Sequence, residues 1–151
     1  MIRRDEAWLT DHMSRAKTGF QPDKHPKPKK ITCPSEHEEQ KALFYWASVM
    51  LHRYPELKLL HAIPNGGLRN KVVAAKLKAE GVKPGVPDVC LPIPRGGFHG
   101  LYIEMKIIKG YKISDDQDWW AVKLRDQGYK ARLCRGCKEA IEVIEKYLDN
   151  K

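Results

Sequence analysis

The sequence predicts an α/β domain in which helices flank a mixed sheet of about four strands. Three observations favour this fold class. From residue 35 onward, segments alternate in the order helix, strand, helix, strand, strand, helix, strand, helix. Two capping boxes mark helix starts, one formed by Ser35 and Glu38 and the other by Ser114 and Gln117. The 151 residues can bury one hydrophobic core without disulfides or structural metals.

The first two elements follow directly from the Ser35 capping box. Apolar residues recur at helical spacing over residues 35–53 and predict a helix, which Tyr54-Pro55 ends. Residues 57–63 form an apolar segment of strand length, and a turn signal at residues 64–67 follows it. We therefore expect a long helix and then the first strand.

A second helix and a hairpin come next. Residues 69–80 have apolar residues on one helical side and several lysines, and Gly81 is a typical helix stop. The apolar segments 87–91 and 101–108 have strand length. Arg95-Gly96-Gly97 lies between them and can turn the chain back, so we expect these two strands to pair as a hairpin.

The C-terminal part predicts a helix, a strand and a helix. The first of these helices begins at Ser114 and ends at Gly128. Residues 129–134 form the strand, and residues 138–148 place apolar side chains at core spacing along the last helix. With the preceding elements, this order gives the mixed sheet flanked by helices.

The chain divides by composition into an N-terminal arm, residues 1–34, and a domain, residues 35–151. Pro, Lys and polar residues dominate the end of the arm, which is typical of a linker. Its lysines could contact a phosphate backbone or could form a solvated tail, and both interpretations stay open. These lysines are Lys24, Lys27, Lys29 and Lys30.

The charge balance favours a polyanionic partner. Lys and Arg number 28 against 19 Asp and Glu, which gives a formal net charge of +9 and makes nucleic acid the first partner to consider. The sequence contains no apolar run long enough to cross a bilayer and no apolar core of a signal peptide. We therefore expect a cytoplasmic protein with no membrane partner.

The four cysteines are expected to be free thiols, because the cytoplasm keeps thiols reduced. Cys134 and Cys137 form a CxxC pair, as zinc sites and redox motifs do. A structural zinc site needs two further ligands at similar spacing, and neither Cys33 nor Cys90 has a paired neighbour. The spacing of the cysteines therefore does not indicate a structural zinc site.

Three charged residues of the predicted hairpin carry the candidate chemistry. Asp88 lies at the start of one strand, and Glu104 and Lys106 lie two apart on the next, so these two side chains share one face. Their neighbours along the strand are apolar and take the opposite face. A surface salt bridge between Glu104 and Lys106 would be the simplest explanation of such a triplet.

Phosphodiester hydrolysis offers a second explanation. Two carboxylates can hold a hard divalent cation, Mg²⁺ or Mn²⁺, which neutralises charge on the phosphate and acidifies a bound water. The carbonyl of Met105 could serve as a further ligand. An adjacent lysine could orient or help deprotonate the water and stabilise the charged transition state.

The surrounding sequence decides between these explanations by resemblance. One pattern resembles the signature of the PD-(D/E)XK nucleases: Pro87-Asp88, a hairpin-length gap, and then Glu104-Met105-Lys106. The flanking sequence resembles the VRR-NUC (virus-type replication-repair nuclease) branch of these nucleases. Five segments match in order. They cover residues 36–40, 63–69, 81–88, 100–106 and 114–117.

This resemblance implies a restriction-endonuclease-like PD-(D/E)XK core and a role for each matching residue. Asp88 and Glu104 would bind the metal ion, and Lys106 would support the water. Glu36 would reach the site from the first helix, with the nearby Glu38 and Glu39 as alternatives, since acidic residues are common in a first helical turn. Gln117 would organise the site while also capping its own helix.

Other residues receive weaker expectations. Asn65, Arg69 and Lys71, around the second helix, are candidates for contacts with DNA, and Asn65 could equally serve the turn. Trp119 and Trp120 occupy consecutive helical positions, so at most one points straight into the core. For the other we also expect core packing rather than base stacking.

The expected function is therefore a metal-dependent deoxyribonuclease with no small-molecule cofactor. Compact proteins that resemble this chain act on branched DNA, including Holliday junctions, and symmetric cutting of two strands needs two active sites, so we expect a homodimer. Two alternatives stay open. One is a nucleic-acid-binding module without catalysis, and the other is a restriction-type nuclease or an exonuclease acting on other DNA.

Overall fold

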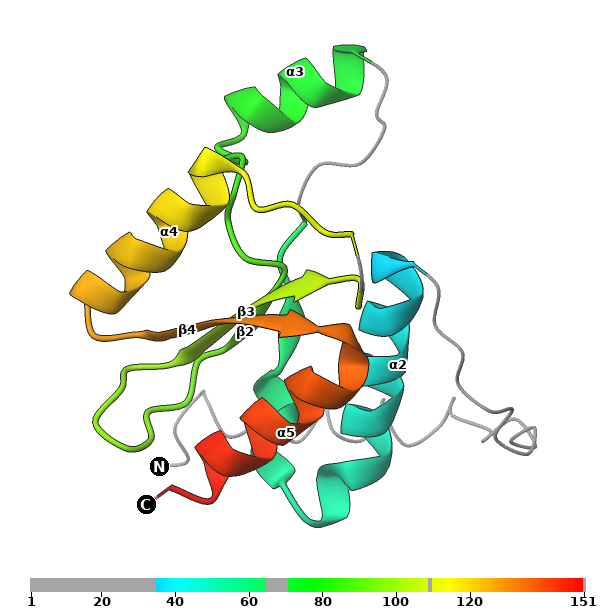
Figure 1. The fold of residues 1–151 in the computed structure, drawn as a ribbon, viewed down its shortest axis with the longest axis vertical. Coiled ribbons are helices and arrows are strands. Elements are labelled where there is room, and N and C mark those ends of the chain that lie inside the picture. Colours follow the sequence, from blue (N-terminus) through cyan, green and yellow to red (C-terminus); the bar gives the residue numbers. More distant parts are fainter. Residues whose placement is uncertain (1–34, 65–70, 109, 151) are drawn as a thin grey trace, which may run out of the picture. The chain divides into compact units, whose positions relative to one another are not determined.

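The computed structural model describes residues 35–64, 71–108 and 110–150. These residues form one four-stranded sheet with the order β1 (His61–Ala62), β2 (Val89–Leu91), β3 (Leu101–Lys106) and β4 (Lys130–Arg135). The pairs β1–β2 and β2–β3 are antiparallel, whereas β3 and β4 are parallel. The predicted mixed sheet of four strands is therefore confirmed (Figure 1).

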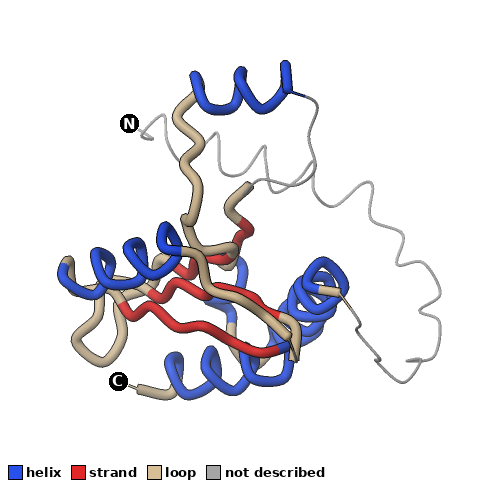
Figure 2. Tube along the Cα trace, turned by 45° about the horizontal axis from the view of Figure 1, so that its top comes forward, coloured by secondary structure: helices blue, strands red, loops and turns tan. Residues whose placement is uncertain are grey.

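Four α-helices accompany this sheet in the described part of the chain: α2 (Glu36–Val49), α3 (Lys71–Ala79), α4 (Asp115–Asp126) and α5 (Gly136–Leu148). Helices α2 and α5 pack together on one face of the sheet, and α4 covers the other face (Figures 1 and 2). Helix α3 stands off the sheet in both views. No described helix combines the length and the apolar character that a membrane crossing requires.

Both predicted helix starts at serine residues are observed. The Ser35 hydroxyl accepts a hydrogen bond from the backbone of Glu38 at 3.3 Å and caps α2. Ser114 and Gln117 form the complete reciprocal capping box of α4. The first helix ends as an α-helix at Val49 and continues as a 3-10 turn, Met50–His52, before the chain reverses.

The predicted strand over residues 57–63 is wrong for most of its length. A 3-10 helix, Pro55–Leu59, takes its place, and only His61–Ala62 pairs as strand β1. Pro55 suits the first helical position, where its missing N–H is not needed. The three-residue repeat then turns Tyr54, Leu57 and Leu60 together into the core, which an extended strand could not do.

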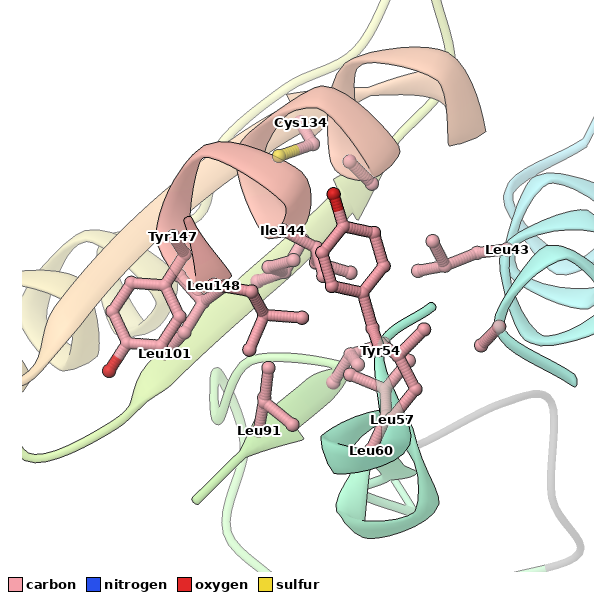
Figure 3. Packing of buried hydrophobic residues seen from close by; sticks show 14 of the residues in the cluster. Leu43, Tyr54, Leu57, Leu60, Leu91, Leu101, Cys134, Ile144, Tyr147 and Leu148 are labelled. Carbon is pink, nitrogen blue, oxygen red and sulfur yellow. The ribbon is translucent and has the colours of Figure 1, made fainter. Parts of the chain in front are cut away.

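The hydrophobic core lies between the sheet and helices α2 and α5 (Figure 3). Leu43 of α2 and Ile144 and Tyr147 of α5 are fully buried against Leu101 and other strand residues. Tyr147 keeps its polar end paired, because its hydroxyl donates to the carbonyl of Ile93 at 2.6 Å. This packing leaves the opposite face of β3 to α4 and to the polar residues described below.

A buried carboxylate joins α2 to the start of α5. Glu39 is only 3% exposed, and its Oε2 accepts a hydrogen bond from the backbone N–H of Cys137 at 2.6 Å. The N-terminus of a helix favours a negative charge. Gly136 has a φ of +78°, and a Cβ there would approach this carboxylate to 3.2 Å, so glycine suits both the backbone and the space.

We expect the substitution E39A to lower the free energy of unfolding by about 2 kcal/mol, because it leaves a helix-terminal N–H without its acceptor. Urea denaturation measures this effect. The matched control is E38A, which removes an exposed carboxylate from the same turn of α2 and should change stability by less than about 0.5 kcal/mol. Equal stabilities of the two variants would contradict the assigned role of Glu39.

Candidate active site

The antiparallel pairing of β2 and β3 brings Asp88 and Glu104 opposite each other. Val89 pairs with Ile103, so the residues one step outward, Asp88 and Glu104, continue the same register. The Asp88 carboxylate reaches across to β3, where its Oδ2 accepts a hydrogen bond from the backbone N–H of Met105 at 2.8 Å. Asp88 is thereby fixed directly before the first residue of β2, next to the charged side of β3.

Glu104 is buried among polar partners on the α4 side of β3. It is 8% exposed, and its Oε1 accepts hydrogen bonds from Lys106 Nζ at 2.9 Å and from the side-chain amide of Gln117. Burial, and then the negative charge of Asp88, raise the pKa of Glu104 from 4.5 to about 7, although Lys106 opposes this shift. Lys106 therefore offsets only part of the effect that burial and the Asp88 charge have on the pKa of Glu104.

Lys106 is a buried ammonium group between two carboxylates. It is 6% exposed, and its Nζ lies 2.9 Å from Glu104 Oε1 and 3.6 Å from Glu36 Oε1. Burial alone lowers the pKa of Lys106, but the hydrogen bond and negative charge of Glu104, and then the charges of Glu36 and Asp88, outweigh it and raise the pKa overall. Lys106 is therefore charged at neutral pH.

The three acidic residues at the start of α2 have different environments. Glu36 lies beside Lys106 and lines the same pocket as Asp88 and Glu104. Glu38 is exposed to solvent. Glu39 points away from this pocket and caps α5. Among these alternatives, the geometry brings Glu36 to the site.

Gln117 connects the start of α4 to Glu104. Its side-chain Oε1 accepts from the backbone N–H of Ser114 at 3.0 Å, and its Nε2 donates to Glu104. One amide group thus completes the capping box and holds the buried carboxylate. Gln117 therefore contacts both the start of its own helix and Glu104, as its suggested roles in capping and in the site require.

These side chains open into a pocket of about 410 Å³. Asp88, Glu104, Lys106, Glu36 and Gln117 line it. The remaining wall comes from α3 and from the loop that leads to β2, and it includes Lys78 and Lys83. The pocket therefore has an acidic floor and basic residues in its wall.

A glycine lets this loop pack against α4. Gly85 has a φ of +78°, which favours glycine, and a Cβ there would lie 2.5 Å from the backbone of Asp116. Any larger residue would push the loop away from the start of α4. Because Asp88 follows three residues later, the close approach at Gly85 helps to fix its position.

The donor set of the pocket fits a hard divalent cation. No group of three or more His, Cys, Asp or Glu side chains converges on a metal position within the described residues. Mg²⁺ needs no such cluster, since proteins bind it through one or two carboxylates, with water and substrate phosphate completing the shell. The half-buried Asp88 and the buried Glu104 supply those carboxylates.

Comparison with known proteins agrees with this arrangement. The model of the VRR-NUC domain family matches residues 29–138. The chain belongs to the VRR-NUC family. A solved structure described as a VRR_NUC domain protein is 31% identical and superposes with a TM-score of 0.62, covering 75% of this chain and 87% of that one. A comparison with curated proteins gives no match.

Membership of the VRR-NUC family establishes the fold class and a nuclease-type function for this chain. The two halves of the PD-(D/E)XK motif meet in the VRR-NUC domain as described, across the β2–β3 pair. Glu36 and Gln117 reach Lys106 and Glu104 from the two flanking helices, α2 and α4. The strand pair and these two helices thus supply the five candidate site residues, and α3 adds to the pocket wall.

Some residues considered in the sequence lie elsewhere. Asn65 and Arg69 are outside the described residues, and Lys71 is described only as the first residue of α3. Cys90 and Cys134 are buried free thiols, as expected. Cys33 lies in the N-terminal arm, which the structure does not describe.

The expectation of core packing for Trp119 and Trp120 is wrong. Trp119 is 55% exposed, and Trp120 is only partly buried, with its Nε1 donating to the carbonyl of Pro84 at 3.0 Å. Helix α4 buries Leu124 instead and turns both indoles toward the loop that follows α3. Short-range spacing cannot show which residues of α4 the sheet covers.

Sequence reasoning did not assign Lys78 and Lys83 to the site. Both line the pocket, one from α3 and the other from the loop before β2. The sequence did contain a signal for both lysines. Lys83 falls within the segment 81–88 that resembles the family, and Lys78 lies in the last turn of a lysine-rich helix. Only the fold shows that these two segments flank the carboxylates.

The raised pKa of Glu104 should make the stability of the metal-free protein depend on pH. A proton binds Glu104 more tightly in the folded state, so its stabilisation is complete below the unfolded pKa of about 4.5 and is lost as pH rises through about 7. In EDTA, E104Q should therefore gain stability relative to the native chain between pH 5 and pH 8. We expect a gain of about 2 to 3 kcal/mol.

Urea unfolding of both proteins at several pH values measures this difference, and the comparison cancels the titration of groups that do not interact with Glu104. The absolute stabilities can differ by a constant, because E104Q also changes the contact with Lys106. A difference that does not vary with pH would show that the pKa of Glu104 is not raised.

Proposed function

We propose that this VRR-NUC domain is a Mg²⁺- or Mn²⁺-dependent deoxyribonuclease that hydrolyses phosphodiester bonds. The observation that carries the proposal is the meeting of Asp88 and Glu104 beside Lys106 in one pocket. Burying the Glu104 carboxylate beside the half-buried carboxylate of Asp88, with one adjacent ammonium, is unfavourable for the fold alone. A divalent cation bound at this site would offset the negative charge of the two carboxylates and so explains why they lie together.

Asp88 and Glu104 would hold the cation, with the backbone carbonyl of Met105 as a proposed further ligand. The bound cation would supply charge neutralisation at the phosphate and a water of lowered pKa. Asp88 is held by the Met105 N–H and Glu104 by Gln117, so both carboxylates are oriented before a substrate binds. Such partners of metal ligands commonly contribute to metal affinity.

Lys106 would act as a fixed positive charge rather than as a base. Its raised pKa keeps the proton on Nζ at neutral pH, so the ammonium can donate hydrogen bonds to the attacking water and to the phosphate. Glu36 lies 3.6 Å from this Nζ and would hold the ammonium in place as the charge on the phosphate develops. Both residues thereby position the reacting groups.

DNA would bind mainly through its phosphates. The formal net charge of +9 attracts a polyanion, and Lys78 and Lys83 lie in the pocket wall, where a backbone beside the cleaved bond would pass. Asn65, Arg69 and Lys71 remain proposed DNA contacts. Because phosphate contacts do not read sequence, this set favours recognition of DNA structure.

We further propose that the substrate is branched, with Holliday junctions among the candidates, and that the chain acts as a homodimer. Both proposals rest on the resemblance of this compact domain to junction-cutting nucleases. Symmetric cleavage of two strands needs two active sites, and each chain supplies one. Cutting of end-labelled junction, flap, duplex and single-stranded DNA distinguishes this preference from exonuclease or restriction-type activity.

The substitution D88N should reduce Mg²⁺-dependent cleavage by more than about a hundredfold, because it removes a proposed metal ligand. The amide can still accept the hydrogen bond from Met105, so the fold should persist. Cleavage of end-labelled DNA, with Mg²⁺, Mn²⁺ or EDTA, measures the effect. D126N is the matched control, since Asp126 is an exposed residue at the far end of α4.

Three outcomes are informative. Cleavage that needs the metal ion and is lost in D88N but kept in D126N supports the proposal. Cleavage that D88N leaves unchanged would assign the activity to a contaminant and contradict it. DNA binding without cleavage under every metal condition would favour a binding module without catalysis.

A further inference from the structure

A second hollow adjoins the catalytic pocket on the surface between α4 and the loop after α3. Its volume is about 600 Å³. We call it the tryptophan groove. Its principal walls are Trp119 and Trp120 of α4, Val82, Lys83 and Pro84 of the loop, and Lys78 of α3.

The two indoles form an aromatic corner in which Trp119 is the exposed ring. Their ring centroids lie 5.5 Å apart and their planes are perpendicular. The hydrogen bond from Trp120 to the carbonyl of Pro84 fixes this ring against the loop, and Trp119 packs edge to face on it with 55% of its surface exposed. An exposed and pre-ordered tryptophan is typical of a binding surface, because it costs little entropy to engage.

The tryptophan groove is continuous with the catalytic pocket. Lys78, Val82, Lys83 and Pro84 line both hollows. A DNA strand with its phosphate at Asp88 and Glu104 can therefore leave the pocket over the two lysines and arrive beside Trp119. Neither Lys78 nor Lys83 forms an ion pair with another residue in the described part of the chain.

The charges around the tryptophan groove suit a nucleotide. Lys78 and Lys83 can contact phosphates on the side shared with the catalytic pocket. The acidic residue of the groove is Asp116, at the start of α4. A phosphate would therefore lie at the lysine side of the groove, and an uncharged base at the indole side.

We propose that the tryptophan groove binds an unpaired nucleotide of the DNA substrate next to the cleavage point. The base stacks on Trp119, and adjacent phosphates contact Lys78 and Lys83. This inference rests on the proposed nuclease function and narrows its substrate to branched DNA that carries unpaired nucleotides, such as flaps and forks. Bases inside a continuous duplex stack on each other and offer no free face, whereas every unpaired base does.

Binding of fluorescently labelled DNA to the full chain in EDTA tests the proposal without cleavage. The probes are a forked DNA with unpaired arms and a fully paired duplex of equal length. We expect W119A to weaken binding of the fork about tenfold, as lost base stacking does, and to change duplex binding less than twofold. W119F, which keeps an aromatic face, should retain most of the affinity for the fork.

Two further variants separate this effect from general ones. K83A should weaken binding of fork and duplex alike, because phosphate contacts do not distinguish them. Y45A removes another half-exposed aromatic ring, on α2, and should change neither affinity. The thermal unfolding temperature of each variant identifies any loss of folded protein, and the exposed positions of Trp119 and Tyr45 make such a loss unexpected.

Equal weakening of fork and duplex by W119A, or no weakening, would overturn the inference. So would a change of W119A from dimer to monomer in sedimentation, since the groove would then be an interface between copies of the chain. Metal-dependent cleavage that D88N abolishes, together with either result, would leave the nuclease proposal standing. Absence of any DNA binding by the native chain would overturn both.

Discussion

The candidate active site depends on one electrostatic constraint. The buried carboxylate of Glu104 lies next to the half-buried carboxylate of Asp88 across an antiparallel pair of strands. Asp88 and Glu104 occupy adjoining positions of the β2–β3 register, and Lys106 supplies the nearest positive charge. This charge does not balance the site, because burial and Asp88 still raise the pKa of Glu104 to about 7. A divalent cation between the carboxylates would offset their negative charge, so the cost of the arrangement in the metal-free fold and its proposed use in catalysis would have the same origin.

The rest of the fold holds these groups in place from both faces of the sheet. Helix α2 brings Glu36 to Lys106, and the buried Glu39 anchors this helix to the start of α5. Helix α4 brings Gln117 to Glu104, and the close contact at Gly85 fixes the loop that leads to Asp88. The same loop and α4 form the tryptophan groove, so the elements that position the carboxylates also shape the surface next to them.

Local sequence signals predicted much of this architecture, and long-range packing limited the rest. The capping boxes at Ser35 and Ser114 and the alternation around Glu104 depend on neighbouring residues, and the fold class they indicated is confirmed. Residues 57–63 were wrongly predicted as a strand, because an apolar run does not distinguish a strand from a 3-10 turn until the core is known. The exposure of Trp119 and the capping role of Glu39 depend on contacts between distant segments, which no local pattern contains. The roles of Glu36, Asp88, Glu104, Lys106 and Gln117 in catalysis remain predictions, although the structure brings all five to one pocket.

Anomalous diffraction from crystals soaked in Mn²⁺ would show whether Asp88 and Glu104 together bind one divalent cation. We expect one strong anomalous peak about 2.2 Å from a carboxylate oxygen of each residue, as for a hard cation with oxygen ligands. The peak should vanish in crystals of the variant D88N. A Mn²⁺ peak at another position, with the two carboxylates still held by Met105 and Gln117 at saturating Mn²⁺, would show that Asp88 and Glu104 do not form the metal site.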